Sequence, residues 1–85
     1  MRKRPQTITF ARRTLRRDIL REAKVIGIAP GSAEAIADIT VEKVAKWAEG
    51  RAEITESDLD RIVAEKIKPY NADLAYVFKE RGKII

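Results

Sequence analysis

Helix start and stop signals divide this chain of 85 residues into four segments with a helical period. Apolar side chains recur in each segment at intervals of three and four residues, which is the spacing of an amphipathic helix. Glycine or proline closes the segments, at Gly27, Gly50, Pro69 and Gly82. The pattern predicts a mainly α fold, a compact domain of about four helices.

The length of the chain allows one domain, so we predict a single domain over residues 1–85. Its helical body should span residues 11–82. Residues 1–10 are basic and end in the alternating stretch Thr7-Ile8-Thr9-Phe10, which indicates a short strand. We therefore expect a basic strand, a short N-terminal β-hairpin or an arm ahead of the helical body.

The first two helices are predicted from their apolar stripes. The first should run from Ala11 to about Ile26, with a buried stripe of Leu15, Ile19, Ala23 and Ile26. The second should begin after Ser32, a good N-cap residue, and end at about Glu49. Its buried face should hold Ala33, Ile36, Ile39, Val44 and Trp47. The second helix has the wider apolar arc, so we expect it to be the central one.

The third and fourth helices carry capping signals. Thr55 is placed to cap the amide of Asp58, and Ile54 and Leu59 stand at the two positions of a hydrophobic staple. Asn71 can cap the fourth helix, which should end at Gly82.

Positive charge is concentrated at the start of the chain. Residues 1–21 hold eight basic residues and one acid, which gives this segment a net charge of +7. The remaining residues carry −2, so the whole chain carries +5. Such a basic pole attracts phosphate-bearing partners through long-range electrostatics. The same pattern also fits a solvated helix face with a basic tail.

The residue types needed for most independent catalysis are absent. The chain has no histidine and no cysteine, so the commonest general base, thiol nucleophiles and zinc sites are excluded. We expect no enzyme, no catalytic residues, no metal site and no required cofactor. The carboxylates Glu53, Glu56, Asp58 and Asp60 are interpreted as complements to a helix N-terminus rather than metal ligands.

No apolar run approaches the roughly 18–20 residues that a membrane span needs. The basic N-terminal segment lacks the apolar stretch of a signal peptide. We therefore expect a cytoplasmic protein without a membrane partner.

Several motifs, read in order, resemble the ATP-cone family of small nucleotide-binding regulatory domains, found in ribonucleotide reductases and in the repressor of their genes. Residues 2–10 have the length of the family's opening hairpin, and Leu15 follows Phe10 by five residues. The late helix is matched by Ile54-Thr55, Leu59, Val63 and Ile67, and the closing helix by Ala75-Tyr76, Lys79 and Arg81. The chain departs from the family pattern at Arg4-Pro5, where the family has Asp-Gly, and at Thr14, where a lysine is usual.

The resemblance implies a stand-alone ATP-cone-like regulatory domain that binds ATP, dATP or a related nucleotide. It implies that Arg2, Lys3 and Arg12 bind phosphates and that Ile8 and Phe10 lie near the base. Binding would change how the domain associates with a partner enzyme or with itself.

Two alternatives remain open from the sequence. The first is a nucleic-acid-binding protein that uses Arg4, Arg12, Arg13, Arg16, Arg17 and Arg21. Residues 48–59 are similar to the loop and third helix of archaeal histones, although the preceding helix is shorter than a histone central helix. The second is a protein-interaction module without nucleotide binding, for which Leu20 and the terminal Ile84-Ile85 are the only hints.

Overall fold

The computed structural model describes residues 10–83 and shows the predicted mainly α domain. Four helices follow one another: α1 (Arg12–Val25), α2 (Pro30–Ala48), α3 (Glu56–Ile67) and α4 (Ala72–Lys83). This part of the chain contains no strand. The predicted β-hairpin falls on residues 1–9, which lie outside the described residues.

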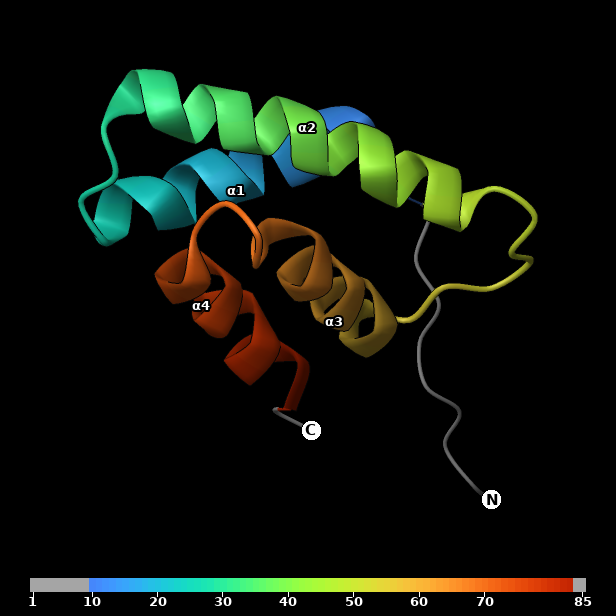
Figure 1. The fold of residues 1–85 in the computed structure, drawn as a ribbon. Helices are drawn as coiled ribbons and strands as arrows, with labels where there is room; N and C mark the ends of the chain where they lie inside the picture. The colour runs from blue at the N-terminus through green and yellow to red at the C-terminus, as the bar shows by residue number, and fades with distance from the viewer. Residues whose placement is uncertain (1–9, 84–85) are drawn as a thin grey trace.

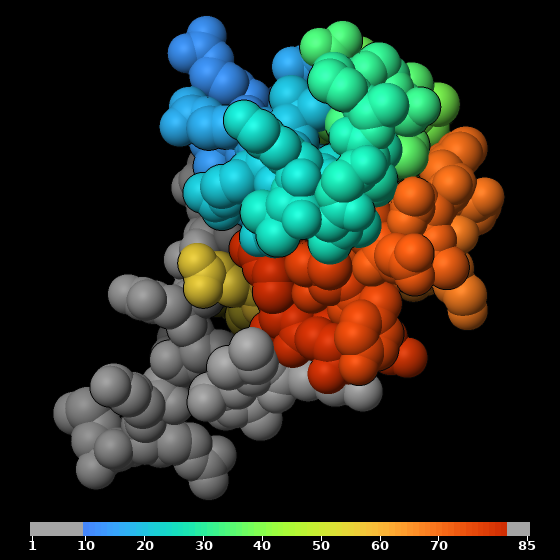
Figure 2. Space-filling model, turned by 90° about the vertical axis from the view of Figure 1, so that its left-hand side faces the viewer, coloured from blue at the N-terminus to red at the C-terminus, as the bar shows by residue number. Residues whose placement is uncertain are grey.

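The helices are arranged as two antiparallel pairs. α1 packs along α2 and α3 packs along α4, and the second pair lies beneath the first (Figure 1). Contacts from α2 to α3 and from α1 to α4 join the pairs. The space-filling view shows the end of α1 above α4, the helix that it contacts (Figure 2).

All four helices contribute to one apolar core. Ile19, Val44, Ile67, Leu74 and Phe78 are completely buried within it. Burying a side chain of this size stabilises a fold by about 1.5–3 kcal/mol. The core therefore binds the two helix pairs into one domain.

The predicted stripe of α1 is confirmed for its first three members, Leu15, Ile19 and Ala23, which are buried. Ile26 is 38% exposed, so its place in the stripe was wrong. The helix ends one residue earlier, because Gly27 adopts a φ of +84° and the amide of Ile28 bonds the carbonyl of Ala23 at 2.9 Å. This is a Schellman ending, in which glycine supplies the left-handed residue.

α2 starts earlier than its sequence signal indicated. Pro30 occupies the first turn and Ala29 is the N-cap, without a side-chain cap, so the predicted cap at Ser32 was wrong. Proline suits this position because its missing N–H would have no partner there in any case.

One residue of the predicted α2 face was also wrong. Ile39 is 41% exposed, whereas Thr40 is completely buried. The buried stripe runs through Ile36, Thr40 and Val44 at intervals of four, and Ile39 lies outside it. Trp47 is partly buried and packs against the core.

The predicted caps of α3 and α4 are confirmed. Thr55 Oγ1 accepts the amide of Asp58 at 3.1 Å, and Asn71 Oδ1 accepts the amide of Leu74 at 2.9 Å. Ile54 is buried, and the half-buried Leu59 packs on the core. The predicted stop at Gly82 was wrong, because α4 continues to Lys83.

Candidate functional site

Two arginines at the start of α1 bridge to acids on α2. Arg16 Nε donates to Asp38 Oδ1 at 2.7 Å, and Arg12 Nε lies 3.7 Å from Glu42 Oε2. The hydrogen bond to Asp38 raises the pKa of Arg16, and the charge of Asp38 adds to the effect. These bridges link the paired helices across their exposed edge.

A third arginine of α1 pairs within its own helix. Arg21 Nη2 lies 2.6 Å from Asp18 Oδ1. Arg13 and Arg17 are exposed, and within residues 10–83 they form no ion pair. Arg4, the remaining member of the predicted nucleic-acid set, lies outside the described residues. Of the five arginines of the predicted nucleic-acid set that the structure describes, three thus form ion pairs with carboxylates.

An open hollow, which we call the Phe10 hollow, lies between the start of α1 and the end of α2. Its volume is about 510 Å³ and its lining is Phe10, Arg12, Ala45, Ala48, Glu49, Arg51, Ala52 and Ile54. Small-molecule sites commonly span about 300–1,000 Å³. The structure therefore brings two residues of the predicted nucleotide site, Phe10 and Arg12, to one surface. The other three, Arg2, Lys3 and Ile8, lie outside the described residues.

Arg51 completes the cationic side of the Phe10 hollow. α2 ends at Ala48, and Gly50 turns the chain with a φ of +78°, which a residue with a side chain rarely adopts. The Arg51 guanidinium then lies over the Trp47 ring, 4.4 Å from its centroid. Stacking orients a guanidinium and leaves its edge N–H groups available to an anion. Arg51 was not recognised from the sequence, because its role depends on the Gly50 turn.

A second hollow on the other side of Phe10 is acidic. It measures about 210 Å³, and its charged lining is Asp18, Glu56, Asp60 and Arg81. Carboxylates repel phosphate, so this hollow is a poor phosphate site. Of the two hollows beside Phe10, only the Phe10 hollow offers two guanidinium groups.

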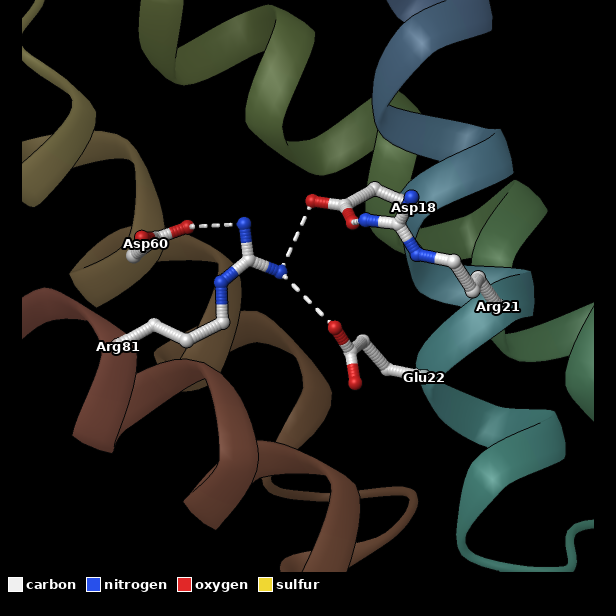
Figure 3. Close-up of polar contacts among 5 residues, drawn as sticks. All are labelled: Asp18, Arg21, Glu22, Asp60 and Arg81. Atoms are coloured by element: carbon white, nitrogen blue, oxygen red, sulfur yellow. Dashed lines mark hydrogen bonds and ion pairs between the residues drawn. The ribbon is translucent and has the colours of Figure 1, made fainter.

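Arg81 lies among three carboxylates from two other helices (Figure 3). Its Nη1 is 2.9 Å from Asp18 Oδ2 and 3.5 Å from Glu22 Oε2, and its Nη2 is 3.7 Å from Asp60 Oδ1. Burial raises the pKa of Asp60, and the nearby charge of Arg81 lowers it by less. These contacts, which we call the Arg81 cluster, tie α4 to α1 and α3.

Two negative findings concern the part of the chain that the structure describes. No group of three or more His, Cys, Asp or Glu side chains there could hold a metal ion. Among residues 10–83, no helix combines the length and apolar character required to cross a bilayer.

Comparisons of the chain with protein-family models, with curated proteins and with solved structures found no match. The resemblances to ATP-cones and to archaeal histones therefore remain predictions from the residues quoted for them.

Proposed function

We propose that this domain is a nucleotide-binding regulatory module that takes ATP, dATP or a related nucleoside triphosphate in the Phe10 hollow. The observation that carries the proposal is the meeting of Phe10, Arg12 and Arg51 around one open hollow. An aromatic ring and two guanidinium groups are suited to a flat base and its phosphates.

Phosphate would be held by the two arginines of the hollow. A guanidinium can donate two parallel hydrogen bonds to phosphate oxygens. The bridge from Arg12 to Glu42 is loose at 3.7 Å, and both side chains are more than 60% exposed. Exposed pairs of this kind contribute about 0–1 kcal/mol, so Arg12 can leave Glu42 for a ligand at small cost.

The rest of the lining suits the other parts of a nucleotide. Phe10 is half-buried, and Ala45 and Ala48 offer a flat apolar wall for the base. Glu49 is the acid of the hollow, and a carboxylate accepts hydrogen bonds from ribose hydroxyls. This arrangement supports binding of a whole nucleotide rather than of free phosphate.

The ion pairs of α1 support a nucleotide over nucleic acid as the ligand of this helix. Arg16 and Arg21 already contact carboxylates at 2.7 and 2.6 Å. A strand that contacted all five described arginines would have to replace these pairs. A single triphosphate in the Phe10 hollow leaves both in place.

Titration with ATP and dATP, followed by backbone amide shifts, tests the proposal. We expect saturable shifts at Phe10, Arg12 and Arg51 at millimolar nucleotide. Arg51→Gln should weaken ATP binding about 5- to 10-fold, because a charge-assisted phosphate contact is lost. Lys24→Gln removes the same charge from an exposed α1 position outside the hollow and should leave the affinity unchanged.

The proposal fails if no amide near these three residues shifts, or if Lys24→Gln weakens binding as much as Arg51→Gln. The regulatory role in this proposal is tested by a separate measurement. Sedimentation of the domain with and without saturating ATP should show a change in self-association, or in association with a partner enzyme.

A further inference from the structure

The structure separates arginine from lysine in their use of ion pairs. Each of the ion pairs that the structure describes between residues 10 and 81 is made by an arginine. None of the six lysines between Lys24 and Lys79 pairs with a carboxylate. Lys43 contacts Tyr70 instead, through a hydrogen bond and from above the ring. The charge of these lysines is therefore not neutralised by a carboxylate, and it remains available to an anionic ligand.

Five of these lysines border two shallow depressions that adjoin one another. The first lies between α2 and the end of α3, has a volume of about 650 Å³ and is bordered by Lys43, Lys46 and Lys66. The second lies between α3 and α4, has a volume of about 350 Å³ and is bordered by Lys68 and Lys79. Glu65 lines both depressions, so they are neighbours. We call this surface of Lys43, Lys46, Lys66, Lys68 and Lys79 the lysine strip.

Two exposed aromatic rings stand among these lysines. Tyr76 is 62% exposed and lines the second depression, beside the small side chains of Ala64 and Ala75. Tyr70 is 43% exposed, and its hydroxyl accepts a hydrogen bond from Lys43 Nζ at 2.9 Å. Lys43 Nζ also lies 5.0 Å from the centroid of the Tyr70 ring. Exposed rings interleaved with cations that pair with no carboxylate can form a stacking platform with phosphate contacts beside it.

We propose that the lysine strip binds single-stranded nucleic acid. Its cations would contact successive phosphates, and Tyr70 and Tyr76 would each stack on a base. Charge complementarity favours an anionic chain, because Glu65 is the single acid that lines either depression among the described residues. Exposed rings add affinity for a ligand with flat rings of its own, which favours a single strand over an acidic peptide or a closed duplex.

The lysine strip is separate from the Phe10 hollow and from the arginines of α1. None of its lysines lines the Phe10 hollow, and none lies on α1. This inference therefore goes beyond nucleotide binding and does not depend on it. Saturating ATP in the Phe10 hollow should leave nucleic-acid binding in place.

Fluorescence anisotropy with a fluorescein-labelled oligothymidylate of about 12 nucleotides tests the proposal. If three phosphates are contacted, a fourfold rise in salt should lower the affinity about 20-fold. The double variant Lys46→Glu/Lys66→Glu should weaken binding at least tenfold. Neither lysine forms an ion pair with a described residue, so the variant should remain folded, and its melting curve checks this.

The matched control is Arg13→Glu/Arg17→Glu, which makes the same change of charge at two exposed, unpaired residues of α1. We expect less than a threefold loss from this variant. An equal or larger loss of affinity would overturn the proposal. It would mean that the nucleic acid binds α1, or that binding depends on the net charge of the protein alone. Absence of any oligothymidylate binding at low salt would also overturn it.

Stacking is tested separately. Tyr76→Ala should lower the oligothymidylate affinity about 5-fold or more, because a base loses its platform. A labelled poly-glutamate peptide and a DNA duplex of the same length should both bind more weakly than the single strand. The proposal fails if either binds as tightly as the single strand, or if Tyr76→Ala has no effect.

Discussion

The arginines of α1 and the lysines of the strip are both exposed positive charges, but the fold uses them differently. Arg12, Arg16 and Arg21 reach carboxylates on α2 or on α1 itself. The lysines of the strip reach none. Net charge along the sequence therefore does not locate the surface that is available to an anion. That surface depends on which charges are already paired after folding.

The difference follows from side-chain chemistry. The planar guanidinium of arginine matches a carboxylate and keeps its charge in a partly buried setting, as in the Arg81 cluster. The lysine ammonium is more strongly hydrated and gains less from such a pair. Variants that break the ion pairs of arginine should change stability, and variants of the strip should change binding.

The largest expected effect on stability is that of Arg81→Met. This change leaves Asp18, Glu22 and Asp60 without their shared cation, and we expect a loss of about 2 kcal/mol in the free energy of unfolding. Urea denaturation measures it. Arg61→Met breaks an exposed pair with Asp58 and should cost less than about 0.5 kcal/mol. Equal losses in the two variants would show that the Arg81 cluster does not hold the helix pairs together.

Thr40→Val should raise stability. Thr40 is completely buried, and its hydroxyl has no hydrogen-bond partner in the described part of the chain. Valine has the same shape without the buried polar group, so we expect a gain of about 1 kcal/mol.

Thr40 lies on α2, the helix that carries both the acids facing α1 and two lysines of the strip. The variant therefore separates stability from binding, because oligothymidylate affinity should stay unchanged while the melting temperature rises. Thr14→Val, at an exposed position, is the control and should have little effect. A loss of stability in Thr40→Val would contradict the account of the core.

Asp60→Asn tests the pH dependence of the Arg81 cluster. Burial raises the pKa of Asp60 from its ordinary value of 3.8, so the folded protein keeps this proton to higher pH than the unfolded chain. Stability should then fall as pH rises from that value through the raised pKa. Asparagine removes this fall and should stabilise the domain at neutral pH by less than about 1 kcal/mol. Denaturation midpoints measured across acidic and neutral pH would check it, and an unchanged pH profile would contradict the assignment.

The smallest expected effect is that of Arg16→Met, which removes the bridge to Asp38. The two side chains are 42% and 63% exposed, so the melting temperature should fall by about 2 °C at most, and by less in high salt. Lys46→Met, in the strip, should leave the melting temperature unchanged. If Lys46→Met lowered it as much, the distinction between paired arginines and unpaired lysines would not hold.

Much of the fold could be predicted because its signals are local. The caps at Thr55 and Asn71 depend on residues three positions apart, and the left-handed turn at Gly27 depends on one residue. The errors also have local reasons. Ser32 is a better capping residue than Ala29 by type, but α2 begins at Pro30, so Ser32 lies inside the helix.

Less of the candidate site could be predicted. Phe10 and Arg12 were expected near one ligand, and they do line one hollow. Arg51 was missed because it reaches that hollow only through the turn at Gly50 and the ring of Trp47. The lysine strip was missed because its members come from three helices and the residue that follows α3, and because the sequence beyond residue 21 has a negative net charge.

The sequence by itself determined four helices, their approximate ends, most of their buried faces and the absence of histidine and cysteine chemistry. Only the tertiary structure decided which charges from different helices meet. Helix periodicity acts over three or four residues, whereas an ion pair such as Arg16 with Asp38 joins residues 22 positions apart. Packing of the helix pairs therefore decides which cations are bound to carboxylates and which remain exposed to a ligand.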